Sequence, residues 1–320
     1  MRKLLLRAGA LLGLLACITG DVAALSAQTD DAILRDFLWQ NFIKRPADER
    51  PKIGLALSAG GIRGFAHVGT LEILSNAGVP IDMMSGTSMG AVVGALYAGG
   101  IAPEKLWEIG SHLSMRSITP DLNVVGLWRF LFAKKLPSSA NLTNFFHQQL
   151  GDIQFEDLKI PFSCAAMDVK TGERVVFNSG PLAIAVRASM NLPGVFSPVE
   201  YRHRNLVDGA VVDYLPVESV KKMGADYIIA SVTPPDFFSK TPQTIAAYLI
   251  RVGDVRGAAM IEEAAQKADF VLTNRVVDVG TLELDQFYKA GEVGILEAHQ
   301  HLEELKQSIL LFAWPYVLKP

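Results

Sequence analysis

The sequence predicts an α/β fold in which helices cover both faces of a mainly parallel sheet. Short apolar runs alternate along the chain with segments of helical periodicity, which is the pattern of successive strand–helix units. Half of the 320 residues are hydrophobic and a fifth are charged, so the chain can bury a sizeable core. This composition excludes disordered, collagen-like and coiled-coil chains. We find neither an internal repeat nor an obvious linker.

Charge and cysteine content exclude several functional classes. The formal net charge of −3 provides no overall basic field that would hold nucleic acid. The only two cysteines, Cys17 and Cys164, provide neither a disulfide framework nor a cysteine-based zinc site. We expect Cys164 to be a small buried hydrophobic residue. The sequence contains no visible cluster of metal ligands, and we predict neither a metal nor another cofactor.

The first 26 residues have the pattern of a secretory signal peptide. Basic residues precede an uncharged run over residues 8–16, which is too short to span a bilayer as a helix. The run ends in Leu-Leu-Ala-Cys at Cys17, which resembles a bacterial lipobox, where cleavage precedes a lipid-modified cysteine. Ordinary cleavage near residues 24–27 is the alternative. We expect an exported protein, periplasmic or associated with the outer membrane, in which residues 27–52 form a polar lead-in.

The strands and helices can be assigned in order from residue 53. A buried strand over residues 53–58 leads into a glycine-rich turn and a helix over residues 65–76, which Gly78 is placed to end. A short strand over residues 81–85 precedes a helix over residues 91–98. The remaining expected elements are strands over residues 161–168, 174–178 and 227–232 and around Val207, and helices over residues 182–190 and 296–311.

The first chemical motif is a G-x-S-x-G sequence centred on Ser88. It runs from Gly86 to Gly90 and lies between a predicted strand and a predicted helix. This context places a serine on a sharp turn with its hydroxyl above the sheet, and small residues two positions away avoid the neighbouring backbone. Ser88 is therefore a candidate nucleophile.

The second motif is the glycine-rich loop over residues 58–64, which also follows a strand and precedes a helix. Backbone amides at such a position form an anion pocket. A nucleotide phosphate loop fits poorly, because neither the G-x-x-x-x-G-K-[ST] nor the G-x-G-x-x-G pattern is present. The better interpretation is an oxyanion hole for an intermediate formed on a serine.

The third motif is Asp-Gly-Ala at Asp208, Gly209 and Ala210. An Asp-Gly pair is usually only a turn signal, but a nucleophilic serine needs a base. Among the histidines, His203 is the best placed alternative base, and a Ser–His–Asp triad is disfavoured rather than excluded. The full set of histidines is His67, His112, His147, His203, His299 and His301.

These motifs together resemble those of patatin-like phospholipases. The loop over residues 57–67, the serine motif and Asp-Gly-Ala occur in the order and spacing of that family, and the block over residues 188–199 also looks like it. The resemblance covers about residues 53–220. It implies a three-layer α/β/α fold related to cytosolic phospholipase A2. Residues 221–320 lie beyond the resemblance, and we expect them to form a strand–helix extension packed on the same domain.

The resemblance also implies roles for individual residues. Ser88 would be the nucleophile and Asp208 the base of a Ser–Asp dyad that needs no metal. The oxyanion hole would comprise the amides around Gly60, Gly61 and Ile62, with Arg63 beside them. The sequence departs from the family at Ala59, where the first glycine of a triplet is usual. If that position required a positive φ, alanine would strain the loop by about 1 kcal/mol.

We therefore expect an exported lipid acyl hydrolase that cleaves carboxylic esters of phospholipids or other acyl lipids. The alternatives are a general carboxylesterase or thioesterase without a membrane role, and a non-catalytic lipid-binding envelope protein. The departure from the family pattern at Ala59 is the reason to consider the last of these. Residues 124–132 are apolar and aromatic and precede two lysines, which suits a membrane interface, a lid or a core helix. Residues 310–318 are similar, and we expect them to pack against the domain. The sequence indicates no oligomeric state.

Overall fold

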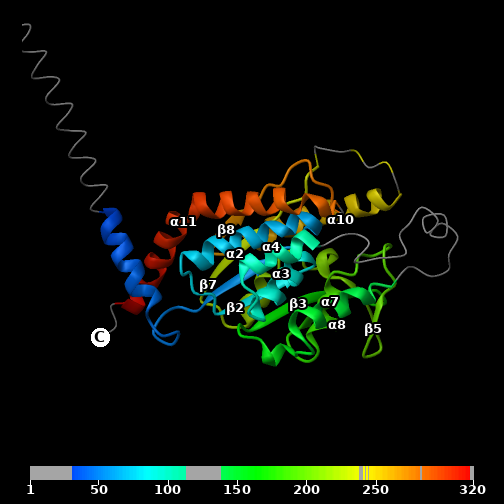
Figure 1. The fold of residues 1–320 in the computed structure, drawn as a ribbon, viewed down its shortest axis with the longest axis horizontal. Coiled ribbons are helices and arrows are strands. Elements are labelled where there is room, and N and C mark those ends of the chain that lie inside the picture. The colour runs from blue at the N-terminus through cyan, green and yellow to red at the C-terminus, as the bar shows by residue number, and fades with distance from the viewer. Residues whose placement is uncertain are drawn as a thin grey trace, which may run out of the picture.

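The computed structural model describes residues 31–112, 138–237, 241, 243, 245–281 and 283–317 (Figure 1). The predicted signal peptide with Cys17 and the apolar segment over residues 124–132 lie outside the described residues. A helix over residues 31–43 precedes the sheet. None of the described helices has the length and unbroken apolar character that a membrane span requires.

An eight-stranded sheet forms the centre of the fold. Its order is β5-β6-β3-β2-β1-β7-β8, and β4 pairs with β3. The strands are β1 (Ile53–Leu57), β2 (Met83–Thr87), β3 (Phe162–Asp168), β4 (Arg174–Phe177), β5 (Val199–Tyr201), β6 (Arg204–Asp208), β7 (Tyr227–Val232) and β8 (Phe270–Thr273). Strands β3, β2, β1, β7 and β8 run parallel, whereas β4, β5 and β6 join by antiparallel pairing. The predicted mainly parallel sheet is therefore confirmed.

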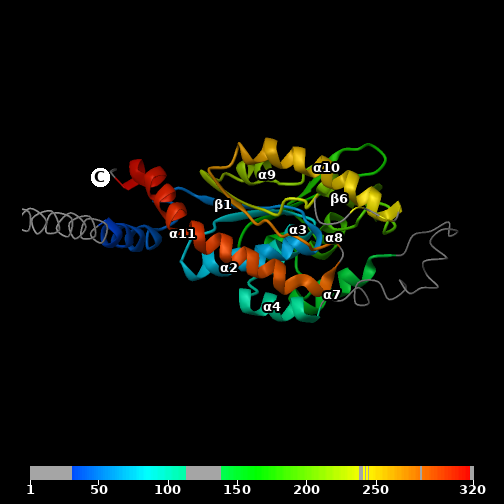
Figure 2. The ribbon, with the colours of Figure 1, turned by 90° about the horizontal axis from the view of Figure 1, so that it is seen from above.

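Helices cover both faces of this sheet. They are α2 (Ala66–Asn76), α3 (Met89–Ala98), α4 (Pro103–His112), α7 (Ala140–Leu150), α8 (Leu182–Ser189), α9 (Val217–Lys222), α10 (Ile245–Ala265) and α11 (Phe287–Val317), with the 3₁₀ turns η1 (Gly61–Phe65), η2 (Phe155–Asp157), η3 (Gly209–Val211) and η4 (Leu284–Gln286). Figure 2 shows α9 and α10 on one side of the sheet and α2, α4 and α11 on the other. The three-layer α/β/α architecture is confirmed.

The two faces have separate hydrophobic cores. Successive side chains of a strand point to opposite faces, and β1 shows this directly. Leu55 and Leu57 belong to the larger core, which α2, α3, α8 and α11 cover. Ala56 belongs to the smaller core, together with Val217 and Val220 of α9. The continuous apolar run of β1 is thus explained by burial on both sides.

The main corrections to the predicted elements are at β2 and in the last hundred residues. Strand β2 begins two residues later than expected, because the Asp82 side chain makes other contacts just before the strand. Its carboxylate accepts a hydrogen bond from the Ile53 amide at 2.7 Å and pairs with Arg50 at 2.7 Å. Helix α11 begins at Phe287 rather than near residue 296. Strands β7 and β8 complete the same sheet, since β7 pairs directly with β1.

Strand β3 separates the ends of β2 and β6. In the parallel pairing, Thr87 of β2 lies opposite Ala165. In the antiparallel pairing, Asp208 of β6 lies opposite Ala166. Ser88, which follows Thr87, and Asp208, the last residue of β6, therefore lie close to neighbouring residues of β3.

Candidate active site

Ser88 occupies the sharp turn between β2 and α3. Its backbone has φ 55° and ψ −121°, which is a strained conformation for a residue with a side chain. Its amide donates a hydrogen bond to Ser189 Oγ at 3.0 Å. A Cβ on Gly86 would overlap the Gly90 carbonyl, and a Cβ on Gly90 would overlap the carbonyl of the residue that ends β1. The spacing of the motif is thus required by close backbone contacts around the serine.

The Ser88 side chain is hydrogen-bonded to the carboxylate of Asp208. Ser88 Oγ donates to Asp208 Oδ2 at 2.6 Å, and the Ala210 amide donates to the other oxygen, Oδ1, at 2.9 Å. A Cβ on Gly209 would overlap the carbonyl of Ala165, so a glycine is needed to keep the Asp-Gly-Ala turn against β3. The structure therefore brings together two motifs that lie 120 residues apart in the sequence.

Asp208 is 1% exposed, and its burial changes its acidity. Desolvation raises the pKa of the carboxyl to about 7, and the hydrogen bonds from Ser88 and Ala210 oppose this effect. A carboxylate with a pKa near neutrality is a much stronger base than an exposed aspartate. The geometry and the electrostatics of this pair are those needed to take a proton from the serine hydroxyl.

Two glycines present unused amides beside this pair. Gly60 and Gly61 line the same cavity as Ser88, and their N–H groups donate to none of the described residues. Gly61 has φ +56°, and a Cβ on it would overlap Thr281. The predicted set needs one correction, because the Ile62 amide already donates to the Thr281 carbonyl at 3.0 Å. The candidate oxyanion donors are therefore the amides of Gly60 and Gly61.

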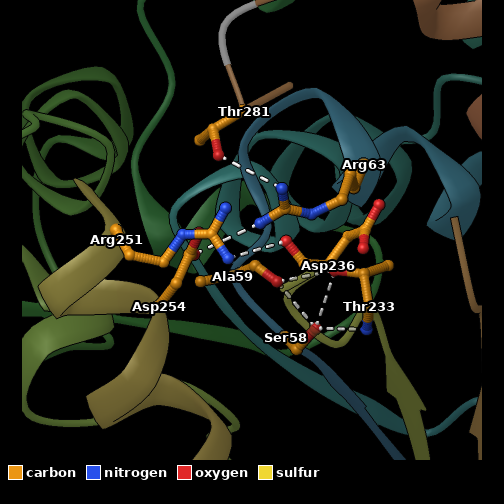
Figure 3. Close-up of polar contacts among 8 residues, drawn as sticks. All are labelled: Ser58, Ala59, Arg63, Thr233, Asp236, Arg251, Asp254 and Thr281. Atoms are coloured by element: carbon orange, nitrogen blue, oxygen red, sulfur yellow. Dashed lines mark hydrogen bonds and ion pairs between the residues drawn. The ribbon is translucent and has the colours of Figure 1, made fainter. Parts of the chain in front are cut away.

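Arg63 is buried and points toward α10 and the loop before α11 (Figure 3). Its guanidinium forms an ion pair with Asp254 of α10 at 3.2 Å and donates to Thr281 Oγ1 at 3.2 Å. Burial raises the pKa of Asp254, and the charge of Arg63 opposes that rise. Arg63 thus ties the glycine-rich loop to two segments that the sequence motifs did not include.

Ala59 does not have the positive φ that would strain an alanine. The described non-glycine residues with positive φ do not include Ala59, so alanine has no conformational cost at this position. Its amide donates to the Tyr214 carbonyl at 2.9 Å, and its carbonyl accepts from Ser58 Oγ at 2.8 Å and Thr233 Oγ1 at 2.7 Å (Figure 3). The position that needs a positive φ is Gly61, two residues later, and it is a glycine.

The histidines lie away from this chemistry. His67 is fully buried, with Nδ1 2.8 Å from Ser231 Oγ and Nε2 2.9 Å from the Ser58 carbonyl. Burial lowers its pKa to about 4, so it is a neutral structural residue at pH 7. His203 is exposed in the turn between β5 and β6. No histidine hydrogen-bonds to Ser88 or Asp208 in the described part of the chain, so the described residues form no Ser–His–Asp triad.

A cavity of about 400 Å³ opens at Ser88 and Asp208. Its walls come from the glycine-rich loop, from the segment around Leu192, from η3 and from α10, which contributes Val252 and Arg256. A smaller apolar pocket of about 50 Å³ also contacts Ser88. Its apolar lining includes Met89, Met190, Leu192, Val195, Phe196 and Leu284. The serine hydroxyl therefore lies between two apolar spaces.

Several residues of the site were missed from the sequence. Ser189 holds the Ser88 amide, and the Asn191 carbonyl accepts from the Asp208 amide at 2.9 Å. Both lie in the block over residues 188–199, whose resemblance could have indicated them. Asp254 and Thr281 had no such signal, because they come from segments without a motif. Among the described residues, no group of histidine, cysteine and acidic side chains is arranged to hold a metal ion.

The fold and the strained serine turn define this protein as an α/β protein with a G-x-S-x-G serine between a strand and a helix. The family model described as patatin-like phospholipase matches residues 55–221, just over half of the chain. The chain belongs to the patatin-like phospholipase family.

Relatives in both sequence and structure agree with this membership. An uncharacterised NTE family protein of Mycobacterium tuberculosis is 36% identical over 183 residues, which are 56% of this chain and 48% of the relative. Lysophospholipase nte1 of Neurospora crassa is 28% identical over 290 residues, which are 81% of this chain and 19% of the fungal protein. The chain thus spans about half the length of the first relative and a fifth of the second.

Solved structures share the fold at low sequence identity. VipD from Legionella pneumophila superposes with a TM-score of 0.52 at 12% identity, covering 80% of this chain and 67% of VipD. Human GIVD cytosolic phospholipase A2 also gives 0.52 at 12% identity, covering 88% of this chain and 64% of that protein. The fold therefore extends well beyond the segment that the family model matches.

Proposed function

We propose that this protein is a lipid acyl hydrolase that cleaves carboxylic esters through an acyl–Ser88 intermediate. The observation that carries the proposal is the 2.6 Å hydrogen bond from Ser88 Oγ to a buried carboxylate, inside an apolar cavity that is also lined by Gly60 and Gly61, whose amides donate to none of the described residues. Membership in the patatin-like phospholipase family supports an acyl lipid as the substrate.

In the first half of the reaction, Asp208 removes the Ser88 proton as Oγ forms a bond to the ester carbonyl carbon. The carbonyl π electrons move to oxygen, and the amides of Gly60 and Gly61 are placed to stabilise the resulting oxyanion. When the oxyanion collapses, the bond to the leaving alkoxide breaks and Asp208 returns the proton to it. The products are the free alcohol and the acyl–Ser88 ester.

In the second half of the reaction, a water molecule is the nucleophile, as the Ser88 hydroxyl was in the first half. Asp208 takes a proton from water, the hydroxide oxygen attacks the acyl carbon, and the same amides stabilise the second oxyanion. Collapse breaks the bond to Ser88 Oγ, which recovers its proton from Asp208. The fatty acid leaves, and the starting state of both residues is restored.

The two apolar spaces at Ser88 can each receive one part of a bound ester. A carbonyl at Ser88 Oγ can extend one chain into the cavity that α10 borders and the other group into the pocket lined by Met190 and Phe196. The lining is apolar in both directions, which suits an acyl lipid better than a polar ester. An activated short-chain ester is also small enough to enter.

The test is the reaction of the protein with a fluorophosphonate probe and with a short-chain p-nitrophenyl ester. We expect Ser88 to be labelled, and we expect Ser88→Ala and Asp208→Asn each to lose activity by a factor of about 10³ or more. Because the two groups act as one unit, the double variant should lose little more than either single variant. Near-normal turnover by Asp208→Asn, with collapse of activity in His203→Ala, would contradict the dyad.

The substrate class is decided by a second comparison. An enzyme that acts on membranes should hydrolyse phospholipid vesicles faster than the same ester groups presented as monomers, whereas a general carboxylesterase or thioesterase should prefer monomers. Absence of probe labelling would favour a non-catalytic lipid-binding role. The reason for considering that role was strain at Ala59, and Ala59 does not have a positive φ.

A further inference from the structure

The first half of α10 has an exposed apolar face. Tyr248, Val252 and Val255 are 57%, 67% and 58% exposed, and their spacing of four and three residues places them on one side of the helix. Exposed apolar side chains at helical spacing, rather than scattered singly, indicate an interaction surface. We call this set the α10 face.

Neighbouring residues extend the α10 face. Phe237 is 38% exposed and lies against Arg251 of α10, whose guanidinium is 5.4 Å from the ring centre. Val277, 56% exposed, lies next to Asp278, whose amide is bonded to the Asp236 carboxylate. Phe237 therefore adds exposed apolar surface beside α10, and Val277 adds more on the segment that is bonded to Asp236.

The α10 face is continuous with the active-site cavity. Val252 belongs to both, because it is largely exposed and also lines the cavity that contains Ser88 and Asp208. Figure 2 shows α10 on the outside of the molecule, beyond the sheet. A lipid that leaves an apolar phase at this face would meet Val252 at the entrance to the cavity.

Within this stretch of α10 the exposed charge is positive, whereas the neighbouring segment has an exposed acid at Asp278. Between residues 245 and 261 the sequence has three charged residues: Arg251, Asp254 and Arg256. Asp254 is nearly buried and paired with Arg63, so the exposed charge is that of Arg256, which lines the cavity, with Arg251 half-buried beside it. The face ends at the exposed acids Glu262 and Glu263, which limit it to the cavity mouth.

We propose that the α10 face docks on the surface of a lipid bilayer, with Arg256 against lipid phosphates and the cavity mouth toward the acyl chains. The inference rests on the proposed function, since it supplies the substrate to the same Ser88. Apolar side chains beside arginine suit the boundary between headgroups and acyl chains. This location differs from residues 124–132, the segment for which the sequence suggested a membrane interface or a lid.

Docking at this helix would act on the catalytic loop as well. The opposite side of α10 carries Asp254, which holds Arg63 of the glycine-rich loop (Figure 3). The helix that contacts lipid is therefore also the helix that fixes the segment carrying the oxyanion donors. A bilayer that orders α10 would order that segment.

A site-specific fluorescence measurement tests the orientation on the full chain. In a Cys17→Ser background, the remaining Cys164 is buried and its thiol pKa is raised by desolvation, so it does not react with a thiol probe. An environment-sensitive NBD group attached at Tyr248→Cys should shift to the blue with vesicles of phosphatidylglycerol and phosphatidylcholine. The matched control is Leu296→Cys, which is 68% exposed on α11 and should not shift.

A shift at Phe37→Cys, 64% exposed on the helix over residues 31–43, with none at position 248, would overturn the proposal. A dimer in size-exclusion chromatography that Tyr248→Asp abolishes, without any vesicle-induced shift, would overturn it too, because the face would then bind a second copy of the chain.

Activity measurements separate this inference from the proposed function. The double variant Tyr248→Asp/Val255→Asp should bind anionic vesicles at least about tenfold more weakly and hydrolyse vesicle lipid correspondingly more slowly. Its hydrolysis of a monomeric short-chain ester should be unchanged, because neither residue lines the cavity. Unchanged vesicle binding and hydrolysis would overturn docking alone, whereas an unlabelled Ser88 in the wild type would overturn the proposed function.

Discussion

The burial of Asp208 has a cost in stability that should depend on pH. Its carboxyl pKa is raised from 3.8 to about 7 because the folded protein removes it from water. Between those values the unfolded chain has released the proton while the folded chain retains it. Stability therefore falls as pH rises from about 4 to about 7, and the loss is complete above the folded pKa.

The substitution Asp208→Asn isolates this effect. The amide oxygen can still accept from the Ala210 amide, and the NH₂ group can donate to Ser88 Oγ, so the shape and both contacts are retained. The variant does not titrate at this position. A shift of about three pKa units corresponds to about 4 kcal/mol, so the substitution should stabilise the protein by up to that amount at pH 8 and by far less at pH 4.5.

Urea denaturation of wild type and variant at several pH values measures the difference. The free energy of unfolding of the variant minus that of wild type should grow with pH and level off above about pH 7 to 8. The wild-type kcat/KM for a monomeric ester should rise about tenfold between pH 6 and pH 8, because the ionised carboxylate of Asp208 is the base that we propose. Parallel pH dependences of stability in the two proteins would refute the reasoning, since burial would then not raise the pKa.

Four further outcomes follow from the site and the amino terminus. Gly61→Ala should reduce turnover by about 10² or more, measured with a monomeric ester, because its Cβ overlaps Thr281 and displaces an oxyanion donor. Ala59→Gly should not raise turnover and should lower the free energy of unfolding by about 0.5–1 kcal/mol, since the native φ does not need glycine. Asp254→Ala should destabilise the protein by about 3 kcal/mol in the same denaturation assay, by leaving Arg63 buried without its partner, and conversion of the pair to Leu and Met should recover much of the loss. If Cys17 is lipidated after export, as we propose, Cys17→Ser should move the protein from the membrane to the soluble fraction without changing hydrolysis of soluble esters, and a mature chain that starts near residues 24–27 without lipid would contradict this.

The sequence predicted most of the sheet because burial on both faces leaves an unambiguous pattern. Strand β7 matches its predicted range, and β1 ends only one residue early, since their apolar runs are bounded by polar or glycine residues. The predicted start of β2 was two residues too early, because Ile81 fits the pattern of a strand whereas the Asp82 carboxylate pairs with Arg50. Hydrophobic pattern carries no information about such an ion pair.

The nucleophile and its carboxylate partner could be proposed from the sequence because each lies in a turn with local backbone requirements. Ser88 needs glycines two positions away, and Asp208 needs a glycine after it, and both needs are visible in neighbouring residues. The Ile62 amide was assigned wrongly because its acceptor, Thr281, lies more than two hundred residues away. Helix α10 was not among the predicted elements, so the α10 face, which depends on the exposure of its side chains, was missed as well.

The position of β3 between the strands that carry Ser88 and Asp208 also bears on folding. Ser88 follows β2 and Asp208 ends β6, and their alignment depends on the register of both strands against Ala165 and Ala166. No local element contains the site, so helices can form before Ser88 and Asp208 are brought together. Pairings between distant segments form late because the chain must first close long loops. Recovery of esterase activity during refolding therefore reports directly on the closing of the sheet, and it should lag behind the recovery of helical circular dichroism.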